Sequence, residues 1–296
     1  MFILLRLDLK KIVNIISQIN LFYFFLAFLL IFLSFLIKIY RWNYIQKVQG
    51  MHYKFRDSFA MNMSSYVIGM ITPGQLGEMG KFMYLKKDGH PATKAIMSVV
   101  LDRVFDVVLL VFWGLVGLVL FFGPSREIIW LFVLVLAASI LIVFFVKNKP
   151  LRDRFLKLIA PIIPKKYRNS LQSLPETIAK EVKKLTAVNY TFIISLSAIS
   201  WVFFFFQANF LIKAINVNNI PFIYVALAAT LARFISLIPI SILGLGTREG
   251  TLLVLLTPYH VLPESVVSFS LLMAIIMLMV GLIGLFFWFK KPIPIK

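Results

Sequence analysis

Seven ionisable residues lie within or beside apolar segments, where a charged side chain is costly. A charge at the centre of a bilayer costs about 2.5–3.5 kcal/mol on insertion scales, so such residues are usually buried, paired and functional. They are Glu78, Asp102, Arg103, Asp106, Arg233, Arg248 and Glu249. Arginine suits bidentate binding of phosphate, and a carboxylate can orient an arginine or relay a proton. We expect these side chains, together with Gln75, to form a site for an anionic head group such as a lipid phosphate.

Three of these charges share one expected helix. Asp102 and Asp106 are four residues apart and lie on one helical face, and Arg103 can pair with Asp106 along that helix. If the helix enters the membrane near Ala92, Arg103 lies roughly 16 Å deep, near the middle of a hydrocarbon core about 30 Å thick. The pair of Arg103 and Asp106 fits a binding site, and it also fits a structural ion pair that locks two helices together.

Two further apolar segments are each interrupted by a proline and glycines, followed by a glutamate that is expected to open a new helix. The break residues are Pro73, Gly74 and Gly77 before Glu78, and Pro239, Gly244 and Gly246 before Glu249. Broken helices at matching positions of two halves are typical of an inverted-topology repeat in transporters. The breaks therefore predict re-entrant hairpins at 58–88 and 221–257. Two simpler readings stay open, in which proline and glycine only kink ordinary spans and the glutamates only cap helices.

Five segments are long and apolar enough to cross a membrane as helices; they are 21–40, 95–122, 128–146, 190–212 and 265–289. Lys and Arg concentrate in cytoplasmic loops. This rule places Lys38, Arg41 and Lys81, the loop 148–188 and the C-terminus on the cytoplasmic side. We expect one membrane domain. Its parts are an interfacial helix at 1–19, a first repeat at 20–122, a linking span at 127–147, a basic cytoplasmic loop at 148–188 and a second repeat at 189–290.

Composition supports this fold class and excludes several functions. The chain of 296 residues is 60% hydrophobic and 15% charged, with a mean hydropathy of +0.92, and a soluble fold of this size could not hide so much apolar surface. We expect an all-α integral membrane protein with about five full spans and two re-entrant hairpins. The net charge is +19, and the basic residues lie mostly between the apolar runs. This distribution favours anionic lipid over nucleic acid as the partner. The absence of cysteine excludes thiol chemistry. Without a phosphate-binding P-loop motif, we expect no cofactor, and we expect no metal.

Three stretches together resemble the lysylphosphatidylglycerol synthase transmembrane family, also called flippase-like. They are SYVIGMITPGQLGE at 65–78, SVVLDRVFD at 98–106 and IPISILGLGTRE at 238–249. The resemblance implies a membrane domain that moves a lipid between leaflets, which is aminoacylated phosphatidylglycerol in the best-known members. Asp102 stands where the family usually has Glu, and this change keeps the charge. Family members often have one more span before 21–40, and the fused synthases carry a soluble aminoacyl-transferring domain. Only seven residues follow Phe289 here, so we expect no lipid aminoacylation by this chain.

The leading hypothesis is a lipid flippase or scramblase-like transporter in the cell membrane, for an anionic or phosphate-bearing lipid. Arg103, Arg233 and Arg248 are expected to bind the head group, while the four carboxylates orient them or relay a coupling proton. Two other classes stay open. One is a membrane-embedded polyprenyl-pyrophosphate phosphatase, with Glu78 or Glu249 as the base and Ser236 or Ser241 nearby. The other is an accessory subunit that serves partner membrane enzymes in glycan or lipid assembly.

Overall fold

The structure is a computed structural model that describes residues 8–127, 180–236 and 246–290, with isolated positions 130, 134, 148, 244 and 292. Every element of this described part is a helix, and the expectation of an all-α membrane protein is confirmed. The predicted span at 128–146 and most of the basic loop at 148–188 lie outside the described residues. Among the described helices, four are long and apolar enough to cross a membrane.

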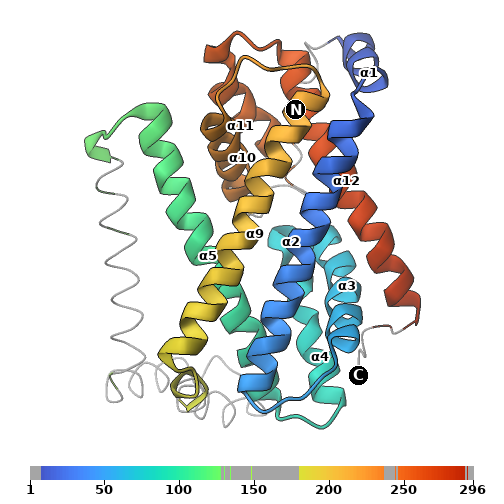
Figure 1. The fold of residues 1–296 in the computed structure, drawn as a ribbon, viewed down its shortest axis with the longest axis vertical. Helices are drawn as coiled ribbons and strands as arrows, with labels where there is room; N and C mark the ends of the chain where they lie inside the picture. Colours follow the sequence, from blue (N-terminus) through green and yellow to red (C-terminus); the bar gives the residue numbers. More distant parts are fainter. Residues whose placement is uncertain are drawn as a thin grey trace, which may run out of the picture.

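These four helices form the frame of the molecule (Figure 1). They are α2 (Leu21–Val48), α5 (Ala92–Phe122), α9 (Ala187–Ala214) and α12 (Pro263–Lys290). Each has at least 28 residues, and at a rise of about 1.5 Å per residue such a helix exceeds a hydrocarbon core about 30 Å thick. Large apolar side chains such as Phe22 and Leu282 lie exposed on their outer faces, as expected of helices that contact lipid. Four of the five predicted spans are therefore found in place.

The predicted end of the first span near Tyr40 is wrong. Helix α2 continues to Val48 and stops at Gln49, immediately before Gly50. Lys38 and Arg41 consequently lie on the helix and not in a cytoplasmic loop, and the side chain of Arg41 is fully buried. A buried arginine can remain inside a helical bundle when carboxylates neutralise it, and the site described below supplies two.

Two broken segments lie in opposite halves of the molecule along its long axis (Figure 1). The first consists of α3 (Phe55–Ile71), the 3-10 helix η2 (Pro73–Gly80) and α4 (Lys81–Lys87). The second consists of α10 (Phe222–Ser236), α11 (Thr247–Leu256) and the 3-10 turn η4 (Thr257–Tyr259). Pro239 lies outside the described residues. Both apolar helices therefore end close to the predicted breaks, and the assignment of these segments as re-entrant hairpins of an inverted repeat stays a prediction.

Glycines let the first broken segment pack tightly. A Cβ atom on Gly77 would lie 2.6 Å from the backbone carbonyl of Ile68, so η2 can fold back onto α3 only with glycine at this position. On the other side of α3, a Cβ atom on Gly284 of α12 would lie 2.6 Å from the carbonyl oxygen of Met63. Helix α3 is thus held between η2 and α12 by backbone contacts, which fixes the position of the residues on η2.

The short helix α1 (Leu9–Ser17) precedes the bundle, within the range predicted for an interfacial helix. Asp8 caps it by accepting a hydrogen bond of 2.9 Å from the backbone N–H of Lys10. The helix packs against α12, and Lys11 Nζ of α1 lies 3.9 Å from Glu264 Oε1 of α12. Its location at a membrane surface stays a prediction.

Candidate functional site

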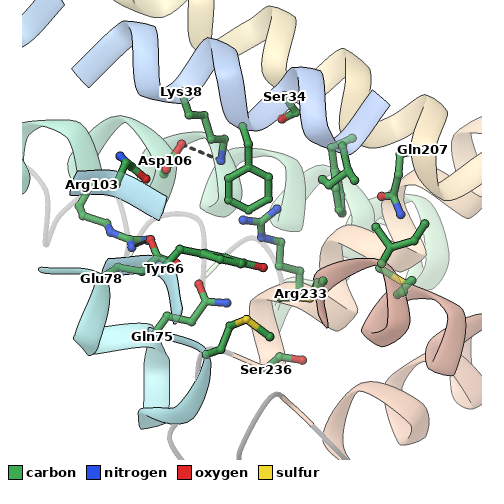
Figure 2. Close-up of a pocket in the computed structure, with 18 of the residues that line it drawn as sticks. Ser34, Lys38, Tyr66, Gln75, Glu78, Arg103, Asp106, Gln207, Arg233 and Ser236 are labelled. Atoms are coloured by element: carbon green, nitrogen blue, oxygen red, sulfur yellow. Dashed lines mark hydrogen bonds and ion pairs between the residues drawn. The ribbon is translucent and has the colours of Figure 1, made fainter. Parts of the chain in front are cut away.

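A cavity lies between the helices and contains about 1290 Å³ of empty space, counted to its open mouth. Side chains from both halves of the chain line it, as Figure 2 shows. Seven of the eight residues predicted to bind the head group are among them: Gln75, Glu78, Asp102, Arg103, Asp106, Arg233 and Arg248. The eighth, Glu249, is not a lining residue but forms an ion pair with Arg248. The expected convergence of the charges is therefore found in the structure, although their roles in binding stay predictions.

Arg41 is the centre of the charged network, and sequence reasoning missed it. Its side chain has 0% exposure, and its Nη2 atom lies 2.7 Å from Asp102 Oδ1. Its Nη1 atom lies 3.0 Å from Asp106 Oδ1 and donates a hydrogen bond of 2.8 Å to Ser197 Oγ on α9. Arg41 therefore joins three helices, α2, α5 and α9, through one guanidinium group.

Two lysines complete this network. Lys38 Nζ lies 3.1 Å from Asp106 Oδ1, and Lys81 Nζ lies 2.8 Å from Asp102 Oδ2. The side chain of Lys81 is buried, and its Nζ lies 4.5 Å from the ring centroid of Trp42. The placement of Lys81 on the cytoplasmic side stays a prediction. We call these five residues, Lys38, Arg41, Lys81, Asp102 and Asp106, the paired cluster. It holds three cations against two carboxylates, so it retains one excess positive charge.

Arg103 does not form the predicted ion pair with Asp106. It instead makes a close ion pair with Glu78 of η2, while Asp106 pairs with Lys38 and Arg41 of α2. The reason is competition from other elements: Lys38 and Arg41 of α2 pair with Asp106, and Glu78 of the first broken segment pairs with Arg103. The prediction that Glu78 opens a helix is also wrong, because Glu78 lies near the end of η2 and α4 begins at Lys81.

The second break has the arrangement that the sequence predicted. Glu249 lies in the first turn of α11, and its Oε2 atom accepts a hydrogen bond of 2.5 Å from the backbone N–H of Gly246. Its other oxygen lies 3.2 Å from Arg248 Nη2. Ser270 of α12 bridges the two side chains, since its Oγ donates to Glu249 over 2.5 Å and accepts from Arg248 Nε over 2.6 Å. Glu249 thus caps the helix and neutralises Arg248 at the same time.

Other break residues shape the backbone around the cavity. The backbone N–H of Gly77 donates a hydrogen bond of 2.8 Å to Thr72 Oγ1, which closes the turn between α3 and η2. Gln75 adopts a φ of 57° and lines the cavity. Pro73 and Gly74 form the start of η2. Gly244 contacts Ser236 at the end of α10.

Arg233 differs from the other cations of the cavity, because it pairs with no carboxylate of the described chain. Its guanidinium carbon lies 5.2 Å from the ring centroid of Phe204 and 6.0 Å from that of Trp201. Contacts of this kind stabilise a cation without neutralising it. Two polar atoms of other cavity residues, Tyr66 Oη and Gln207 Oε1, are buried with no hydrogen-bond partner among the described residues. An unpaired cation beside unsatisfied polar atoms indicates a place where an additional polar group is accommodated.

Together these features define a multi-pass, all-α membrane protein with a charged internal cavity. The family model described as "Lysylphosphatidylglycerol synthase TM region" matches residues 1–284, and the chain belongs to this family. The chain is also similar to UPF0104 membrane protein MJ1595 of Methanocaldococcus jannaschii, with 25% identity over 294 residues that cover 91% of this chain and 84% of that protein. The resemblance expected from the three motifs is therefore confirmed.

Proposed function

We propose that this protein is a flippase or scramblase-like transporter that moves an anionic, phosphate-bearing lipid between leaflets through the central cavity. The main support for this proposal is the positive charge of that cavity. Five basic side chains but only three carboxylates line it among the described residues. In a protein surrounded by lipid, such an excess of positive charge is costly unless an anion offsets it during function.

Membership of a family described by a lipid synthase membrane region supports a lipid as the substrate. The lining of the cavity is consistent with this class. Its walls combine charged groups with apolar ones such as Phe35, Met70 and Ile276. A head group and the first part of its acyl chains would find suitable surroundings there.

The carboxylates of the cavity favour transport over hydrolysis. A general base needs a carboxylate that is free to accept a proton. Glu78 is paired with Arg103, and Glu249 is held by Arg248, Ser270 and the backbone of Gly246. Ser236 donates its hydroxyl to the carbonyl oxygen of Ala232. These groups have the character of structural partners, which weakens the phosphatase alternative.

To test this proposal, the purified protein is reconstituted into liposomes that carry a fluorescent phosphatidylglycerol. The measurement is the rate at which the fluorescent lipid leaves the accessible leaflet. Met277 lines the cavity, while the next residue, Leu278, is exposed on the outer face of α12. Met277→Trp fills the cavity and Leu278→Trp adds the same ring outside it. We expect lipid movement with wild type and Leu278→Trp, and at least a severalfold slower rate with Met277→Trp.

No acceleration over protein-free liposomes, for any anionic lipid, would contradict the transporter proposal. Equal rates for both tryptophan variants would contradict the route through the cavity. In the first case, release of inorganic phosphate from a polyprenyl pyrophosphate would identify the phosphatase class. Neither activity would leave the accessory-subunit class.

A further inference from the structure

We infer, on the basis of the proposed function, that the lipid has an anionic phosphate and an uncharged, hydroxylated head group. The geometry assigns the phosphate to a subsite formed by Arg233 and Tyr66. A lipid whose head group carries ammonium groups, such as lysylphosphatidylglycerol, is disfavoured by the same cavity. This assignment differs from what the description of the family suggests for the substrate.

Arg233 is the cation available to the phosphate. Each of the other four lining cations has a carboxylate within ion-pair distance: Lys38 has Asp106, Lys81 has Asp102, Arg103 has Glu78 and Arg248 has Glu249. Arg233 contacts the faces of Phe204 and Trp201 instead. An aromatic platform holds a guanidinium in place and leaves its N–H donors free for a bidentate contact with phosphate oxygens.

Tyr66 supplies a second donor at the same place. Its side chain is 2% exposed, and its buried hydroxyl has no hydrogen-bond partner in the part of the chain that the structure describes. Figure 2 shows the hydroxyl end of Tyr66 directed toward Arg233. A buried hydroxyl without a partner is costly, and such groups in a native structure usually have a functional reason. A phosphate oxygen at Arg233 would accept its hydrogen bond and remove that cost.

An ammonium group finds no suitable partner in the described part of this cavity. Each lining carboxylate already contacts at least one cation, and Asp102 and Asp106 each contact two. The excess of basic side chains would repel the ammonium groups of a lipid bound in the cavity. Aminoacylation with lysine turns a head group of charge −1 into one of charge +1, and the cavity therefore discriminates against it.

An uncharged hydroxylated head group fits the remaining polar atoms. Gln207 is 3% exposed, and its Oε1 atom is an acceptor without a donor. Figure 2 shows Gln207 and Gln75 on different sides of Arg233. A hydroxyl both donates and accepts hydrogen bonds, so a glycerol head group can satisfy an amide oxygen without adding charge. The phosphate subsite and these amides together define a head group such as that of phosphatidylglycerol.

The first experiment measures binding in detergent, by displacement of fluorescent phosphatidylglycerol from the purified full chain. Unlabelled phosphatidylglycerol and lysylphosphatidylglycerol share the phosphate and the glycerol and differ in the lysyl ammonium groups. We expect lysylphosphatidylglycerol to compete about 10-fold more weakly or worse, because its ammonium groups find no free carboxylate and are repelled by the basic lining. Inorganic phosphate at the same concentration should displace little probe, because it lacks the contacts with the apolar wall.

Three variants locate the subsite. Arg233→Gln removes the charge, Tyr66→Phe removes only the hydroxyl, and Arg56→Gln removes an exposed charge of α3 outside the cavity as the matched control. We expect Arg233→Gln to weaken phosphatidylglycerol binding about 10-fold or more and Tyr66→Phe severalfold. Arg56→Gln should bind like wild type. Tyr66→Phe should unfold at a temperature equal to or above that of wild type, because it loses an unsatisfied buried hydroxyl, so misfolding cannot explain its weaker binding.

The inference is overturned if Tyr66→Phe and Arg233→Gln bind phosphatidylglycerol as tightly as wild type, or if the lysyl lipid competes equally well. Displacement by inorganic phosphate as effective as by lipid would overturn the assignment to a lipid. The liposome assay separates this inference from the proposed function. Transport that is unaffected by Arg233→Gln contradicts the subsite alone, whereas binding that depends on Arg233 without any transport contradicts the transporter alone.

Discussion

The two halves of the chain contribute charge to the cavity in different ways. The first half supplies the paired cluster, in which Asp102 and Asp106 each contact two cations. The second half supplies Arg248, neutralised by its neighbour Glu249, and Arg233, which contacts the rings of Phe204 and Trp201 and pairs with no carboxylate of the described residues. A charge within a membrane protein is therefore not by itself a sign of binding. Among the described residues, the pairing state separates the cations that hold the bundle together from Arg233, which we propose to bind the ligand.

The largest expected effect comes from breaking the paired cluster at its centre. Arg41→Met leaves Asp102 and Asp106 buried with only the two lysines to compensate them. Removal of one partner from a buried ion pair typically costs about 3–5 kcal/mol, and we expect a loss of this size in the free energy of unfolding. Chemical unfolding in detergent measures it, with Arg56→Met on the exposed start of α3 as the control. A loss below about 1 kcal/mol would show that the cluster is not structural.

The second-largest loss of stability is expected at the two helix breaks. Gly77→Ala forces a Cβ atom against the backbone of Ile68, which cannot easily move, and we expect a loss of about 2–3 kcal/mol. Gly246→Ala meets no atom within 4 Å but must keep a φ of 86°, so about 1–2 kcal/mol is expected. Gly250→Ala, inside α11 with open space around it, should stabilise by about 0.5–1 kcal/mol. Thermal unfolding of the three variants gives the order, and equal losses at 77 and 246 would contradict this account of the breaks.

A smaller effect tests the bridge that neutralises Arg248. Ser270→Ala removes the hydroxyl that contacts both Arg248 and Glu249. Hydrogen bonds to charged groups contribute about 1.5–3 kcal/mol, and we expect a loss near the lower end because the direct contact of the two side chains remains. Ser268→Ala is the control, since its hydroxyl only donates to the Glu264 carbonyl within α12. Similar stability of the two variants would remove Ser270 from the bridge.

The smallest effect on stability is expected at Arg233. Its contacts with Phe204 and Trp201 are worth about 0.5–1 kcal/mol at an exposed site and about 2 or more when desolvated. Arg233 is partly exposed, so Arg233→Gln should unfold much closer to wild type than Arg41→Met does. Chemical unfolding of this variant beside Arg41→Met tests the contrast between a ligand-binding cation and a structural one. A loss as large as that of Arg41→Met would place Arg233 among the structural charges.

The sequence was sufficient for the elements whose signal is local. Long apolar runs predicted four of the described spans, and glycine followed by Glu249 predicted the start of α11. It failed where the outcome depends on partners from other helices. Arg41 follows an apolar run and was assigned to a loop, although no proline or glycine interrupts the helical stretch before Gly50. The absence of a helix-terminating residue indicates that the helix continues past Tyr40. The spacing of three residues then places Lys38 and Arg41 on one face of that helix.

Pairing itself could not be predicted from spacing. Arg103 and Asp106 are well placed to interact within α5, yet the competing groups on η2 and α2 decide their contacts. The same holds for Tyr66 and Gln207, which are ordinary residues of apolar helices until the fold leaves them without partners. Whether a polar side chain finds a hydrogen-bond partner depends on every element packed around it. That packing cannot be inferred from a single sequence.

A single backbone contact has a mechanical consequence for the bundle. The N–H of Asn20, just before α2, donates a hydrogen bond of 2.8 Å to the carbonyl oxygen of Ala214, the last residue of α9, and Ser34 bonds to the Ser200 carbonyl farther along the same pair. These two helices are thus pinned at one end and again along their length. The two helices, one from each half of the chain, therefore act as a single rigid unit that ties the halves together.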